Sequence, residues 1–207
     1  MPDMYSEREG PSAAEASEPR ASGLWRWLPW SSPASLRSTR YLLKWLALGT
    51  LIGIVAGLGA ALFYRAIGLA TDLFLGDLVG YHPPQPIGEG SPDRVDPDRP
   101  WLLPLVLALG GLISGFIVFR YAPEAEGHGT DAAIDAIHHK RGTLRARIPP
   151  IKLVASAITI GSGGSGGREG PAAQISAGFG SLLAQWLHLS VEDRRIAVSA
   201  GMGAGIG

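Results

Sequence analysis

Twenty consecutive residues without a charge, Trp45 to Tyr64, constrain the fold of this chain more than any other feature of its sequence. At 1.5 Å per residue, a helix of that length spans about 30 Å, the thickness of the hydrocarbon core of a bilayer. Gly49, Gly53 and Gly57 recur at every fourth position within it. Glycine disfavours a helix in water, whereas in lipid a face of small residues lets a second helix approach closely. The segment therefore predicts a membrane-spanning helix rather than the buried helix of a soluble protein.

A second uncharged run, Trp101 to Phe119, follows a loop that is dense in proline and acidic residues. Basic residues lie before the first run and after the second: Arg37, Arg40, Lys44, Arg120, Lys140, Arg141, Arg145, Arg147 and Lys152. Cytoplasmic flanks carry the excess of Lys and Arg, so the N-terminus and the segment after Arg120 are expected in the cytoplasm and the acidic loop outside. Residues 41–207 are thus expected to form an all-α, multi-pass region embedded in the membrane.

Composition excludes several other classes of function. The 207 residues carry 18 basic and 18 acidic side chains, which leaves no basic surplus to neutralise a nucleic-acid backbone. The absence of cysteine excludes disulfides, thiolate metal sites and cysteine nucleophiles.

Mean hydropathy is +0.16 although residues 1–40 are rich in Ser, Pro, Glu and Arg, and these 40 residues are expected to form a mobile cytoplasmic tail. The lipid bilayer is the expected partner, and no enzyme activity, cofactor or nucleic acid is expected.

The segment that begins at Ile148 departs from a simple spanning helix. Seven residues from Gly161 to Gly167 include five glycines, which a continuous helix does not favour. Within a bilayer, irregular backbone is tolerated only where protein buries it or where it lines a wet cavity. The glycine run therefore predicts a helix that is broken at a functional site. The last stretch, Val191 to Gly207, is expected to open with a polar turn and to end as a flexible apolar segment, as in a chain cut within its structure.

Glu169 follows this break and directly precedes Gly170 and Pro171. Because proline fits the first turn of a helix, Glu169 is expected near the N-cap, beside free backbone N–H groups. Those amides and the helix dipole favour negative charge, so a carboxylate and a permeating anion would compete for one position. Protonation of Glu169 would weaken its hold and admit the anion, which makes a gate that responds to pH. The alternative is an ordinary N-terminal charge in water.

The motif GREGPAAQISAGFGSLL, which starts at Gly167, resembles the GxEGP region of the CLC family of chloride channels and transporters. IPPIKLVASAITIGSGGSGG before it and DRRIAVSAGMGAGIG after it resemble neighbouring helices of that family, so the similarity covers residues 41–207. The resemblance implies two inverted repeats of tilted helices, of which this chain holds most of one, and a homodimer with one anion pathway per subunit. It also implies chloride or another small anion as substrate, Glu169 as the gate, and backbone amides of Gly167, Arg168 and Gly170 as anion ligands.

The family's serine-bearing motif, GSGIP, would fall on residues 127–131. Gly127 and Gly129 match it, but His128 replaces the serine and Thr130 with Asp131 replaces the Ile-Pro pair. An N–H of His128 or the hydroxyl of Thr130 would then contact the anion, or selectivity would differ, so chloride and fluoride both stay open. The family residues that distinguish a channel from a chloride/proton exchanger would lie beyond residue 207, so both activities stay open. Protons would be a substrate only if the protein is an exchanger.

Three other interpretations have some support in the sequence. GSGGSG, from Gly161 to Gly166, satisfies the dinucleotide-binding pattern of a soluble oxidoreductase, which requires a preceding strand. A surface metal site is compatible with four residues at helical spacing, although the basic residues that follow favour a solvated face: Asp131, Asp135, His138 and His139. A structural membrane subunit without transport activity would explain the apolar runs, but not a glutamate beside a glycine-rich break.

Overall fold

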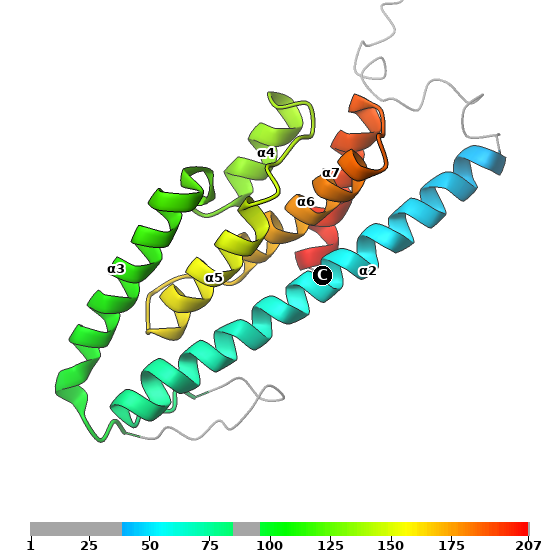
Figure 1. The fold of residues 1–207 in the computed structure, drawn as a ribbon. Helices are drawn as coiled ribbons and strands as arrows, with labels where there is room; N and C mark the ends of the chain where they lie inside the picture. Colours follow the sequence, from blue (N-terminus) through cyan, green and yellow to red (C-terminus); the bar gives the residue numbers. More distant parts are fainter. Residues whose placement is uncertain (1–38, 85–95, 207) are drawn as a thin grey trace, which may run out of the picture. The chain divides into compact units, whose positions relative to one another are not determined.

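The computed structural model describes residues 39–84 and 96–206, and all regular elements among them are helical (Figure 1). The all-α prediction is therefore confirmed. The expected N-terminal tail lies almost wholly outside the described residues. In chain order the elements are α2 (Thr39–Thr71), the π-helical turn η4 (Asp72–Asp77), the 3-10 turn η5 (Pro100–Leu102), α3 (Leu103–Tyr121), the 3-10 turn η6 (Pro123–Ala125), α4 (Thr130–His138), α5 (Ile148–Gly161), α6 (Glu169–Trp186) and α7 (Val191–Ile206).

Two stretches are long and apolar enough to cross a membrane, Tyr41–Asp77 and Pro100–Tyr121. Within their most apolar windows only 22% and 11% of the residues are buried against the rest of the chain. A core helix of a soluble protein would bury most of such a window, so this exposed apolar surface fits contact with lipid. The uncharged run is only the middle of α2, which continues past Tyr64 because neither proline nor a turn sequence follows it.

The glycine face predicted for α2 is not used within the described chain. A Cβ added at Gly49, Gly53 or Gly57 would meet no atom of a neighbouring element within 4 Å. The buried face of α2 instead contains Ile52 and Phe63. Phe63 belongs to a cluster with residues of α5 and α6: Leu153, Ala157, Ala172 and Ile175. The helix is thus held by Ile52, Ala56 and Phe63, and not by the three regularly spaced glycines.

The prediction of a flexible end after Val191 is wrong, because α7 is helical through Ile206. Two of its glycines, Gly201 and Gly205, lie directly against α6. A Cβ at Gly201 would stand 2.5 Å from the carbonyl oxygen of Ser176, and a Cβ at Gly180 would collide with the carbonyl oxygen of Ala197. Close packing between glycine-rich helices compensates for the poor helix propensity of glycine. The low propensity was therefore overridden by tertiary contact.

Candidate functional site

The glycine-rich segment breaks the chain between α5 and α6, as predicted. Helix α5 ends at Gly161, α6 begins at Glu169, and the residues between them are not helical. The first i to i−4 hydrogen bond of α6 runs from the N–H of Ala172 to the carbonyl of Arg168. The amides of Glu169 and Gly170 therefore have no partner within α6, and Pro171 has no N–H to leave unpaired. Glu169 itself is exposed, at the positive end of this helix.

A second irregular segment precedes α4. Gly127 has φ of 77° and Gly129 has φ of 98°, values in the region that glycine tolerates and other residues avoid. Gly129 is the N-cap of α4, and Thr130 is its first residue. His128 is exposed between the two glycines. The backbone thus turns sharply on both sides of His128 before a second helix N-terminus.

The structure brings these two segments together. A Cβ at Gly129 would lie 2.8 Å from the carbonyl oxygen of Gly170, and a Cβ at Gly170 would collide with the carbonyl oxygen of His128. The backbone of residues 128–129 is therefore in direct contact with the first turn of α6. Because α4 also begins here, two helix N-termini lie close to one another, although some forty residues separate them in the sequence.

A cavity of about 480 Å³ adjoins this contact. Its walls come from α3, α5 and both irregular segments, and include Gly127, His128, Lys152, Gly167 and Pro171. Of the residues predicted as anion ligands, Gly127, His128 and Gly167 line the cavity. Gly129 and Gly170 make the backbone contact described above, whereas Thr130 and Arg168 are in neither the wall nor that contact.

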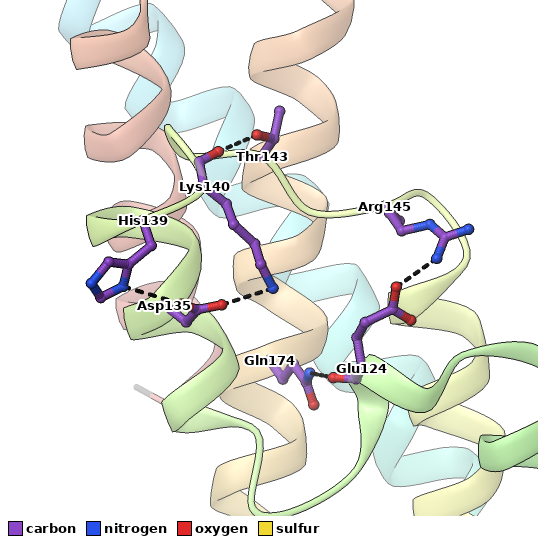
Figure 2. A network of polar contacts seen from close by, with 7 residues as sticks. All are labelled: Glu124, Asp135, His139, Lys140, Thr143, Arg145 and Gln174. Carbon is purple, nitrogen blue, oxygen red and sulfur yellow. Dashed lines mark hydrogen bonds and ion pairs between the residues drawn. The ribbon is translucent and has the colours of Figure 1, made fainter.

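Side chains that the sequence did not single out hold the segment before α4 in place. The ammonium Nζ of Lys152 donates hydrogen bonds to the carbonyl oxygens of Ala125 and Gly127, at 2.8 and 2.6 Å. Gln174 of α6, which is fully buried, donates from Nε2 to the carbonyl oxygen of Glu124 at 3.2 Å (Figure 2). A signal for Lys152 was available, since it is the only charge in the apolar stretch from residue 148 to 161.

Arg168 is placed by an aromatic contact. Its guanidinium carbon lies 4.7 Å from the centre of the Tyr64 ring on α2. A cation over the face of an aromatic ring is attracted by the ring's quadrupole. The residue before Glu169 is thus held against α2 through its side chain, whereas the sequence predicts a role only for its backbone amide.

A network of ion pairs lies on the segments around α4 (Figure 2). Asp135 contacts His139 at 3.1 Å and Lys140 at 2.7 Å, and the hydrogen bond from Lys140 holds the pKa of Asp135 below its usual value. Arg145 donates to Glu124 at 2.5 Å, and this hydrogen bond lowers the pKa of Glu124. Asp135 is thus occupied by basic side chains, which fits the solvated face that the sequence favours better than a metal site.

The dinucleotide-binding interpretation is wrong. That pattern requires a strand before its first glycine, and the residues before Gly161 form helix α5. The β-branched residues near Ile160 favour a strand in water, but here they pack as one helix against α3 and α6.

Comparison with known proteins gives consistent matches. Residues 110–207 match the family model described as voltage gated chloride channel. The chain is 28% identical over 176 residues to a chloride/fluoride channel protein of Pseudomonas syringae, covering 84% of this chain and 33% of that protein. It is 30% identical over 164 residues to an H(+)/Cl(−) exchange transporter ClcA of Vibrio cholerae, covering 77% of this chain and 32% of that one. The chain thus spans about a third of the length of these relatives.

A solved structure shares the fold. The crystal structure of a slow cyanobacterial Cl−/H+ antiporter superposes with a TM-score of 0.51 at 22% sequence identity, covering 82% of this chain and 36% of that one. The helices and their exposed apolar surfaces define the class as an all-helical membrane protein. The chain belongs to the CLC family of chloride channels and H+/Cl− exchangers, a family of transport proteins and not of enzymes.

Proposed function

We propose that this chain forms part of a pathway for chloride or another small anion, and that Glu169 gates the pathway. The backbone contact between residues 128–129 and Gly170 is the observation that carries the proposal. It joins two helix N-termini, and unpaired amides at such ends are a favourable environment for an anion. The anion ligands would be amides of Gly127, His128, Gly129, Gly167, Arg168 and Gly170, with the hydroxyl of Thr130.

The carboxylate of Glu169 would occupy the same environment when no anion is bound. Glu169 is the first residue of α6, and its side chain is not enclosed by the rest of the chain, so it is free to move toward or away from the helix end. Protonation would remove its charge and its preference for the positive end of α6. Anion flux would then increase as the pH falls.

The remaining features follow from family membership. The relatives are named as a channel and an exchanger, and we propose one of these two activities for the full-length gene product, with protons as the second substrate in an exchanger. One relative is named for chloride and fluoride, so both ions belong in the assay. We further propose a homodimer with the N-terminus in the cytoplasm, an orientation supported by the basic residues that flank the apolar runs.

The test uses the full-length gene product in liposomes loaded with chloride or fluoride. Wild-type efflux should increase as pH falls, and Glu169→Gln should give a high flux that no longer depends on pH. Glu192→Gln is the matched control, because Glu192 also lies in the first turn of a helix, α7, but away from the contact. A Glu169→Gln variant with wild-type flux and pH response would reject the gate, and a wild-type protein that carries neither anion would reject the pathway.

A further inference from the structure

Lys152 is a buried cation whose two described partners are backbone carbonyls. Its side chain is only 4% exposed, and it makes no ion pair with any described residue. An ammonium in apolar surroundings is costly unless its donors are satisfied. Carbonyl oxygens satisfy two of its three N–H groups without neutralising its charge. Such an arrangement calls for a role beyond packing, because a methionine of similar shape would fill the space without that cost.

The two carbonyls lie just before His128. A trans peptide places the C=O of one residue and the N–H of the next on opposite sides of the peptide plane. Because the carbonyl of Gly127 points to Lys152, the N–H of His128 points away from it. Within the described residues that N–H has no hydrogen-bond partner. Lys152 thereby keeps the N–H of His128 unpaired. Without this contact, Gly127 and Gly129 would allow the backbone of the segment many other conformations.

We propose that Lys152 is a positioning residue for anion binding. It holds the carbonyls of Ala125 and Gly127 so that the N–H of His128 remains available to the anion, beside the N-terminus of α6. The proposal rests on the proposed function of this site and assigns a task to a residue that does not itself have to contact the anion. Gln174 acts in the same direction from α6, through the carbonyl of Glu124.

The test measures the chloride concentration that gives half-maximal flux, separately from the rate at saturating chloride. Lys152→Met keeps the aliphatic part of the side chain and removes both hydrogen bonds. The chloride concentration at half-maximal flux should therefore rise roughly tenfold, as expected when one amide ligand is lost. Lys152→Arg retains the charge and the donors and should restore most of the affinity. Lys140→Met is the matched control, since it removes an exposed lysine that pairs with Asp135, and it should leave half-saturation unchanged.

A spectroscopic measurement separates positioning from general loss of structure. With ¹⁵N-histidine labelling, and assignment by His128→Gln, the His128 amide resonance should shift with chloride in the wild type and not in Lys152→Met. If Lys152→Met does not fold, Gln174→Met provides a charge-neutral perturbation and should also raise half-saturation. The positioning role would be overturned if Lys152→Met, or Gln174→Met in its place, reached half-maximal flux at the same chloride concentration as the wild type. It would also be overturned if the His128 amide resonance of the variant shifted with chloride as it does in the wild type. Absence of anion flux in the wild type would instead reject the proposed function.

Discussion

Gly129→Ala tests the contact on which the candidate site depends. Gly129 has φ of 98° and ψ of −30°, a conformation that costs an L-residue roughly 1–3 kcal/mol. Its new methyl group would also lie 2.8 Å from the Cβ of Gln174 and from the carbonyl oxygen of Gly170. Overpacking of this kind costs roughly 1–3 kcal/mol more. The two penalties together predict a destabilisation of roughly 2–6 kcal/mol.

The assay is thermal unfolding in detergent, followed by tryptophan fluorescence. A loss of 1 kcal/mol lowers Tm by roughly 2–4 °C in a domain of this size, so Gly129→Ala should lower it by roughly 4–24 °C. Gly127→Ala introduces a similar backbone strain at φ of 77°, but its Cβ would meet nothing within 4 Å. It should therefore show only the strain penalty. Gly111→Ala, at an open helical position of α3, should leave Tm unchanged or slightly raised.

The difference between the first two variants measures the contact with α6. If Gly129→Ala and Gly127→Ala lower Tm equally, the close approach of residues 128–129 to Gly170 is absent from the protein. In that case the convergence of the two helix N-termini, and the anion site inferred from it, would have no structural basis.

Two further predictions concern stability away from that contact. Arg145 lowers the folded-state pKa of Glu124 below its ordinary value of 4.5, so the ionised pair contributes stability that is complete above pH 4.5 and is lost as pH falls through the folded value. Since both side chains are partly exposed, the pair contributes about 0.2–1 kcal/mol to the free energy of unfolding. Below pH 4.5, Tm should therefore fall more steeply with falling pH in the wild type than in Glu124→Gln. Gly180→Val should lower Tm by an amount equivalent to roughly 1–3 kcal/mol, because its side chain would collide with the backbone of α7. The same substitution at Gly203, whose Cβ would meet nothing within 4 Å, should not lower Tm, and equal effects at both positions would contradict the close α6–α7 packing.

Periodicity and composition predicted the helical class and the break before Glu169, because both depend on local backbone preferences. Each glycine in the run from residue 161 to 167 weakens a helix by roughly 0.5–1 kcal/mol, and the chain leaves the helical conformation after Gly161. By contrast, Gly201 lies in a helix that local preference disfavours, because it packs against the backbone of α6 at Ser176 and Gly180. Which face of α2 is buried also depends on neighbours, and the regular glycine spacing pointed to the wrong one.

The candidate site was predicted as two separate segments, and their contact could not be read from the sequence. No periodicity links residues 127–130 with residues 167–170, because their approach depends on how α4, α5 and α6 pack. The same holds for Gln174 and Tyr64, which are unremarkable in the sequence and act only through partners distant along the chain. Lys152 differs, since an isolated charge in an apolar stretch is a signal that the sequence itself contains.

Helix α6 meets the backbone of another segment directly at two places. Its first turn lies against the backbone of residues 128–129, and further along, Gly180 lies against the backbone of α7. At Gly170 and at Gly180 the nearest atoms are backbone atoms of the other segment, with no side chain between them. A tilt of α7 therefore acts directly on the backbone of α6, the helix that begins with Glu169.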